Sequence, residues 1–399
     1  MKIIVAIQRT LLSLCFIVII IIIRVIIILH RTTWDLLPSE EKIYELKYIL
    51  LWTQSDTIPF VYMGEGQSGF ISRNCDFTNC FVTANRDFLS DYRMFDVIAF
   101  HGPEICEYVT INETAMPNKR WPHQQFVFAS IESPENYPIC STRFDSFFNW
   151  TWTYKLDSEI RWGYFVIKNS EGNIIGPNKN MHWLKRNQME EVSDKFKEQL
   201  KSKSKAVAWF VSNCITTSRR EVFALSLKKK LFQNYKLNVD IFGNCTSLKC
   251  SRENEDECYK MIEKDYYFYL SFENAFSEDY VTEKLLIPLQ HNVIPIVYGG
   301  ANYTRFLPQG SYLNARKLGK NKLASKISEL IKDPEEYAAY FKWKNHYSYH
   351  KTSESSETDE YCKMCALLND KQMMRRTSIY QNFYRWWAME SCKSANYEL

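Results

Sequence analysis

The sequence predicts an α/β protein with two facing doubly wound domains, preceded by an N-terminal transmembrane anchor. A run of about 20 apolar residues near the N-terminus is long enough to cross a bilayer. Two blocks of alternating strand and helix patterns follow it, and a lysine-rich stretch ending near Lys205 separates them. The length of 399 residues also exceeds what one ordinary core serves.

The anchor is expected at Thr10–Leu29, where Arg24 is the only charge. The alternative is a cleaved signal peptide, but its apolar region would be about 7–15 residues long and end in small residues. We therefore expect residues 1–9 to form a cytoplasmic tail and residues 30–55 to form a stem outside it. Apolar residues at helical spacing predict a helix in the stem, over Ser39–Trp52.

Sequons and cysteines agree with a luminal location for the rest of the chain. Of the 12 cysteines, 11 follow the anchor, which suits disulfides in an oxidising compartment; because 11 is odd, at least one has no partner within the chain. The formal net charge of +4 is too small to favour nucleic acid as the main partner. Four N-glycosylation sequons stand at Asn112, Asn149, Asn244 and Asn302.

The first domain is expected over 56–200 and the second over 201–345, before a C-terminal segment, 346–399. Apolar runs predict strands of the first domain at Ile58–Met63, Phe95–His101 and Gln125–Ser130. In the second domain the patterns predict strands at Lys205–Val211, Leu237–Gly243, Tyr267–Phe272 and Val293–Gly299, and helices at Ser218–Gln233 and Val281–Gln290. No GxGxxG or Walker lysine loop follows any of these strands, which excludes classical dinucleotide and P-loop sites.

Three charged residues stand where chemistry is plausible. Lys284 opens a helix, where a cation opposes the helix dipole; it either serves a bound anion or is a surface lysine paired with a nearby acid. Glu132 ends an apolar strand and is either a general base or a turn residue. Arg220 opens another helix and either binds phosphate or is a solvated basic residue.

Two cysteines and a histidine also have alternative roles. Cys362 and Cys365 have the CxxC spacing of a redox motif or half a zinc site, but no second pair completes a zinc site, so a structural disulfide is favoured. His101 follows a predicted strand and either touches substrate or is structural.

Together these segments resemble the α1,3-fucosyltransferases, the inverting enzymes that include the Lewis-type and core α1,3 members. FENAFSEDYVTEKL and VIPIVYGGANYTRFLP, at 272–285 and 293–308, look like the donor signature of that family. VAWFVSNCITTSRREVF resembles the start of its donor domain, and FASIESPENYP and NWTWTYKLDSEI resemble its acceptor-side segments. RNCDFTNCFVTANRD and FDVIAFHGPEI fit its early portion, so the resemblance spans roughly 58–365.

The resemblance implies a GT-B fold, in which two Rossmann-like domains face each other across a cleft, and a single-pass type II protein of the Golgi membrane with a luminal catalytic domain. It implies transfer of fucose from GDP-fucose to a GlcNAc hydroxyl of a glycoprotein or oligosaccharide acceptor. Glu132 would be the base that deprotonates the acceptor. Arg220 and Lys284 would offset charge on the departing diphosphate.

Further roles follow from the resemblance alone. Asn274, Tyr280 and Glu283 would hold ribose, fucose or guanine, without assignment to one of them. His101 would lie on the acceptor side, and Cys362 and Cys365 would form the C-terminal CxxC disulfide of the family. No Asp-x-Asp motif offers a nucleotide-bound metal site, so no cofactor is expected to be required, although a divalent cation could stimulate activity.

Two departures from the family pattern concern the acceptor. The segment HGPEI differs from the double-histidine form, and SEIRWGYF lacks a proline before its Tyr-Gly, so acceptor identity stays open. Two alternatives to the leading hypothesis are a GT-B transferase with another nucleotide sugar and a catalytically silent Golgi glycan-binding homologue. Presence of Glu132, Arg220 and Lys284 speaks against the silent homologue.

Overall fold

The computed structural model describes residues 21–25, 45–53, 55–111, 116–250, 254–375 and 379–394. Apart from residues 21–25, which are helical, the anchor expected at Thr10–Leu29 lies outside these ranges. Within them, no helix is both long enough and apolar enough to span a bilayer. Contacts divide the chain after Glu45, and residues 46–399 are described below as one unit.

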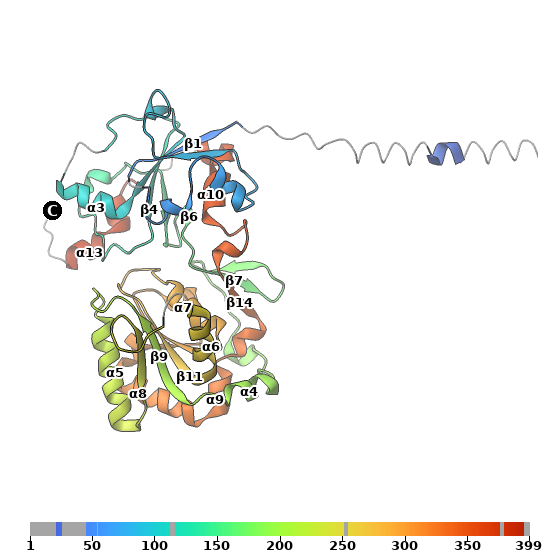
Figure 1. Cartoon of the computed structure of the whole chain (residues 1–399), viewed down its shortest axis with the longest axis vertical. Helices are drawn as coiled ribbons and strands as arrows, with labels where there is room; N and C mark the ends of the chain where they lie inside the picture. The colour runs from blue at the N-terminus through green and yellow to red at the C-terminus, as the bar shows by residue number, and fades with distance from the viewer. Residues whose placement is uncertain are drawn as a thin grey trace, which may run out of the picture. The chain divides into compact units, whose positions relative to one another are not determined.

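A six-stranded parallel sheet forms the first half of this unit (Figure 1). Every residue of β3 and β4 is buried, as expected for a parallel sheet covered on both faces. These two strands confirm the expectations for Phe95–His101 and Gln125–Ser130. In spatial order the strands are β2 Cys80–Thr83, β1 Lys47–Leu51, β3 Val97–His101, β4 Gln125–Ser130, β5 Trp150–Thr153 and β6 Ile160–Arg161.

The helices α2 (Ser68–Ser72) and α3 (Gly102–Ile111) belong to the first half of the chain, but the last helices also pack against this sheet. In Figure 1, α10 and α13, coloured red, lie beside its strands. Tyr361 and Met364 of α10 pack on one face with Ile49, and Phe383 and Trp387 pack on the other with Phe128. These helices are α10 Glu360–Asn369, α11 Lys371–Arg375, α12 Phe383–Trp387 and α13 Met389–Ser394.

The second sheet has five parallel strands, and all of them except β13 were expected from the sequence, as were the helices α5 and α7. Its strands, in spatial order, are β10 Val239–Gly243, β9 Lys205–Val211, β11 Tyr266–Phe272, β12 Ile294–Tyr298 and β13 Leu313–Asn314. The helices around it are α4 Asp194–Leu200, α5 Arg220–Tyr235, α6 Glu255–Asp265, α7 Glu283–Gln290, α8 Ala315–Lys332 and α9 Pro334–Ala339. Apolar residues of α5 and α8 pack on one face of the sheet, and Ile262 of α6 packs on the other.

A small antiparallel sheet joins distant parts of the chain. It consists of β14 (Tyr347–His350), β7 (Val166–Asn169) and β8 (Ile174–Gly176), with β7 in the middle. Because β14 lies after the second parallel sheet and β7 before it, the chain returns here toward its first half.

Two expectations near the start of the unit are wrong. The helix expected over Ser39–Trp52 is replaced at its end by β1, where Ile49 and Leu51 face one core cluster and Leu50 the other. Burial on alternating sides favours a strand over the helical spacing of the same residues. The strand expected at Ile58–Met63 is a 3₁₀ turn, in which Phe60 and Met63 are buried while the two residues between them are exposed.

The pairing of Cys362 with Cys365 is also wrong. The structure pairs Cys362 with Cys75 and Cys365 with Cys80. Cys362 and Cys365 lie one turn apart on α10, so both side chains point from the same face of the helix. This face packs on the first sheet, where Cys75 and Cys80 lie. The remaining disulfides of the described residues are Cys140–Cys392, Cys214–Cys245 and Cys250–Cys258.

Candidate functional site

A cavity of about 470 Å³ gathers five of the residues singled out from the sequence. It lies where β9, β10 and β11 end, the edge of a parallel α/β sheet at which ligands bind. A larger cavity, of about 520 Å³, is lined by β13 and α8 and contains none of the residues singled out. The five are Glu132, Arg220, Asn274, Glu283 and Lys284.

Lys284 stands in the first turn of α7 within a cluster of acceptors. Its Nζ lies 2.8 Å from Thr282 Oγ1, 3.1 Å from Glu283 Oε1 and 3.4 Å from Glu273 Oε2. Burial acts to lower the pKa of Lys284, but the neighbouring carboxylates outweigh it and the net pKa is raised. The ammonium is therefore charged at neutral pH and faces the cavity, which is what a diphosphate requires.

Glu273, a buried acid beside Lys284, was assigned no role from the sequence. It leaves β11, is 1% exposed, and accepts hydrogen bonds from Thr282 N at 2.9 Å and from Thr282 Oγ1. Burial raises the pKa of Glu273, and the positive charge of Lys284 opposes this. The end of this buried strand indicated Glu273 and Asn274 together, but only Asn274 was expected to bind the donor.

Arg220 is fixed at the start of α5 and is 4% exposed. Its Nη1 donates to Phe272 O at 2.7 Å and its Nη2 to Asn213 O at 3.4 Å. Arg220 Nε and Asn274 Oδ1 are buried and have no hydrogen-bond partner among the described residues, and both residues line the cavity. Because buried polar groups are nearly always paired, these two atoms mark positions where a polar ligand can bind.

Glu132 enters the same cavity from the loop after β4. Its Oε2 accepts hydrogen bonds from Tyr280 Oη at 3.1 Å and from Asn136 Nδ2 at 3.0 Å. Tyr280 is 2% exposed, and burial raises its pKa well above the ordinary value, so its hydroxyl stays protonated as a donor. Thr217, just before α5, donates to Asn136 Oδ1 at 2.9 Å and links the Glu132 loop to the Arg220 helix.

His101 lies outside this cavity, at the end of β3 beside Ala129 of β4. It is 8% exposed; its backbone N–H donates to Thr53 Oγ1 at 2.9 Å, and its Nδ1 lies 3.3 Å from Glu104 Oε1. The structure therefore separates it from the residues that surround Lys284.

Aromatic side chains form one end of the cavity and were not singled out before. Phe210 at the end of β9 stacks with Tyr259 of α6, with centroids 6.0 Å apart and planes at 24°. Phe242 and Tyr269 lie beside them. With 25 phenylalanines and 25 tyrosines in the chain, aromatic content alone could not have selected these four.

The sequons differ in accessibility. Asn244 and Asn302 are exposed, whereas Asn149 is 5% exposed and its Oδ1 accepts from Phe126 N at 2.9 Å and Arg120 Nη1 at 3.0 Å. A glycan at Asn149 is incompatible with this packing, so that expectation is corrected. Asn112 lies outside the described residues.

A parallel α/β sheet whose strand ends carry fixed cations, with a carboxylate and aromatic rings around the same cavity, is the arrangement expected of an enzyme that acts on a nucleotide-linked substrate. No cluster of three or more metal-ligating side chains occurs among the described residues. A family model described as "Glycosyltransferase family 10 (fucosyltransferase) C-term" matches residues 200–387, and "Fucosyltransferase, N-terminal" matches 44–165. The chain belongs to this fucosyltransferase family, as the resemblance implied.

Curated relatives agree with this assignment. The chain is 33% identical to alpha-(1,3)-fucosyltransferase C of Drosophila melanogaster over 92% of its own length and 87% of the relative. It is 30% identical to glycoprotein 3-alpha-L-fucosyltransferase A of the same fly, over 81% of its own length and 57% of the relative. A crystal structure of an alpha1,3-fucosyltransferase with GDP-fucose shares 14% identity, with a TM-score of 0.48, over 86% of this chain and 94% of that one.

Proposed function

We propose that the protein transfers L-fucose from GDP-fucose to a GlcNAc hydroxyl of a glycoprotein glycan, forming an α1,3 linkage with inversion. The observation that carries the proposal is the presence of Glu132, Arg220 and Lys284 around one cavity of about 470 Å³. A carboxylate on one side and two cations on the other match the needs of base-assisted displacement of a nucleoside diphosphate. The GT-B arrangement and the two-domain division at residue 200 belong to the same proposal.

In this mechanism Glu132 removes the proton from the acceptor hydroxyl as its oxygen attacks C1 of fucose. The C1–O bond to GDP breaks on the opposite face, GDP leaves with the electron pair, and the proton stays on Glu132. Tyr280 and Asn136 both donate to Oε2 of Glu132, which orients the carboxylate and assigns proton transfer to Oε1.

The charge that builds on the diphosphate is met by Lys284 and by the buried guanidinium of Arg220. Since the guanidinium is held by two backbone carbonyls, its position is set before the donor binds. Preorganised charges of this kind act without reorganisation during the reaction. The aromatic end of the cavity, around Phe210, suits the face of guanine.

A Golgi type II membrane location remains part of the proposal. It is supported by the apolar run at Thr10–Leu29 and by the exposed sequons at Asn244 and Asn302. The disulfides of the described residues suit an oxidising lumen. Protease protection of the full chain in sealed microsomes tests this orientation: digestion of the bulk of the chain without detergent would contradict it.

The test of activity uses the full chain in detergent, radiolabelled GDP-fucose, and core-type and antenna-type N-glycan acceptors. We expect transfer to one class, and we expect Glu132→Gln to lower turnover about 10²-fold or more while GDP-fucose affinity changes only a few-fold. The matched control is Glu171→Gln, the same substitution at an exposed turn. Unchanged turnover in Glu132→Gln would exclude Glu132 as the base, and GDP binding without transfer to any acceptor would favour a silent homologue.

A further inference from the structure

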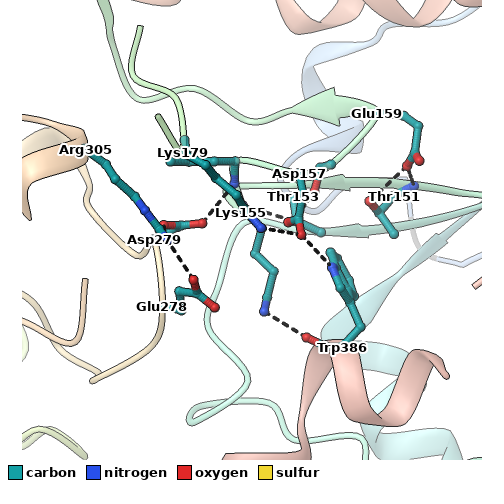
Figure 2. A network of polar contacts seen from close by, with 12 residues as sticks. Thr151, Thr153, Lys155, Asp157, Glu159, Lys179, Glu278, Asp279, Arg305 and Trp386 are labelled. Carbon is teal, nitrogen blue, oxygen red and sulfur yellow. Dashed lines mark hydrogen bonds and ion pairs between the residues drawn. The ribbon is translucent and has the colours of Figure 1, made fainter. Parts of the chain in front are cut away.

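A second polar pocket, of about 350 Å³, lies beside the candidate site and is not used by the mechanism above. Three separate segments build it: the loop after β5, the loop between β11 and α7, and the C-terminal helix α12 (Figure 2). Its lining side chains are Lys155, Asp157, Glu278, Asn382, Arg385 and Trp386, with Asp279 at the base.

Hydrogen bonds fix the walls of this pocket. Asp157 Oδ2 accepts from Lys179 Nζ at 2.7 Å and from Trp386 Nε1 at 3.3 Å. Lys155 Nζ donates to Trp386 O at 2.9 Å and lies 4.9 Å from the centroid of its indole ring. In Figure 2 the dashed lines from Asp157 and Lys155 both end on Trp386, which is therefore held in place by the first half of the chain.

The opposite wall is held from the second half. Arg305 Nη1 donates to Glu278 Oε1 at 2.8 Å and to Asp279 Oδ1 at 2.5 Å. Asp279 is 2% exposed, whereas the side chain of Glu278 is 59% exposed and reaches the pocket. A ligand would thus meet mainly Glu278 on this side.

The pocket is connected to Glu132 through two short steps. Asp279 directly precedes Tyr280, whose hydroxyl lies 3.1 Å from Glu132 Oε2. Lys155 directly follows Tyr154, whose ring packs edge-on against Tyr280 at 4.8 Å between centroids. The pocket and Glu132 are therefore joined through the same pair of buried tyrosines, Tyr154 and Tyr280.

The chemistry of the lining favours a neutral, hydroxyl-rich ligand. Three carboxylates and two cations line the pocket, so its net charge is negative and gives no attraction for a further anion. Carboxylate and amide oxygens accept hydrogen bonds from sugar hydroxyls, and an indole offers an apolar surface to the C–H groups of a pyranose.

We propose that this pocket is an acceptor subsite, which binds the neutral sugar attached to the sugar that receives fucose. The proposal rests on the proposed function, since it assigns the second sugar of the acceptor of that same reaction. Glu278 and Trp386 then determine which glycan is used, and the donor cavity is common to all acceptors.

The test compares a single-sugar GlcNAc β-glycoside with N,N′-diacetylchitobiose and N-acetyllactosamine glycosides, using the full chain in detergent. For each variant we measure the ratio of kcat/KM for the two-sugar acceptor to that for the single sugar. Glu278→Gln and Trp386→Ala should each lower this ratio about tenfold, the effect of losing a hydrogen bond to a charged group or a packed aromatic surface. Trp121→Ala, at a 40% exposed tryptophan of the first half, is the matched control and should leave the ratio unchanged.

Binding of the same glycans in the presence of GDP, followed by saturation-transfer NMR, separates this proposal from the proposed function. The subsite is supported if the unaltered protein binds the two-sugar glycans at least about tenfold more tightly than each variant does. This result supports the subsite even where no transfer occurs. Equal affinities, or a kcat/KM ratio within twofold of the unaltered protein in both variants, would overturn it. Glu278→Gln keeps the result decisive if Trp386→Ala misfolds, because Glu278 is exposed and changes by one atom.

Discussion

The ammonium of Lys284 is expected both to bind the donor and to stabilise the fold. Replacing Lys284 with methionine tests the two roles together. Methionine keeps an unbranched apolar stem but removes the charge that lies 3.4 Å from Glu273 Oε2. Two effects follow. A bound diphosphate loses a cation, and a carboxylate that is 1% exposed loses its counter-charge.

The expected magnitudes come from the contacts. A hydrogen bond to a charged group contributes about 1.5–3 kcal/mol, so GDP affinity should fall about 10- to 150-fold. Removing one partner of a fully buried ion pair costs about 3–5 kcal/mol. Here we expect about 2–3 kcal/mol, since Lys284 is partly exposed and Thr282 still donates to Glu273.

The stability loss should also depend on pH. Burial raises the pKa of Glu273 in the folded protein above its unfolded value, and removal of Lys284 raises it further. A carboxyl whose folded pKa is raised contributes stability that is present below its unfolded pKa and lost as pH rises through the folded pKa. Lys284→Met should therefore be destabilised more at pH 7.5 than at pH 5.

Calorimetric titration with GDP and urea unfolding at the two pH values measure both effects. Lys229→Met, on the exposed side of α5, is the matched control and should change neither. Adding Glu273→Gln to Lys284→Met should restore much of the stability without restoring GDP affinity. A dissociation constant within twofold of the unaltered protein would refute the placement of Lys284 at the diphosphate, and an equal stability loss at both pH values would refute the role of Glu273.

Three further predictions concern the same unit. Tyr280→Phe removes one of the two donors to Glu132 Oε2 and should lower kcat about tenfold with little change in the KM for GDP-fucose, as steady-state kinetics would reveal. Cys80→Ser with Cys365→Ser opens a link between residues 285 apart and should cost about 2–5 kcal/mol, visible as a lower Tm; an unchanged Tm would contradict it. Fucose transfer should survive EDTA, and its abolition with recovery on adding Mn²⁺ would show a required metal.

The second sheet could be predicted closely from the sequence because its strands are buried on both faces. Such strands appear as continuous apolar runs bounded by polar loops, so β9 was placed at the residues that the structure assigns to it. The buried strand β11 also allowed Glu283 and Lys284 to be placed at the site, because the helix that carries them follows β11 and its loop. Glu273 stands at the same strand end as Asn274, but its burial and its pairing with Lys284 arise only in the folded loop, so its role could not be assigned from the sequence.

The first sheet was harder because local patterns there compete. Leu50 and Ile49 fit a helical stripe as well as a strand buried on both sides, and only the neighbouring strands β2 and β3 decide between them. Pro59 precedes a turn that buries Phe60 and Met63 at helical spacing, although the apolar content suggested a strand.

The C-terminal segment could not be placed from the sequence at all, because its contacts join residues more than 250 apart. Cys140–Cys392 has a separation of 252 residues, and Cys75–Cys362 one of 287. These disulfides anchor α10 and α13, and α12 between them packs on the first sheet through Phe383 and Trp387 and supplies Trp386 to the second pocket. If that pocket binds the acceptor, acceptor choice depends on a wall assembled from three distant segments, whereas the donor signature occupies one continuous stretch after β11. This difference explains why short motifs identify the family and its donor chemistry but leave the acceptor open.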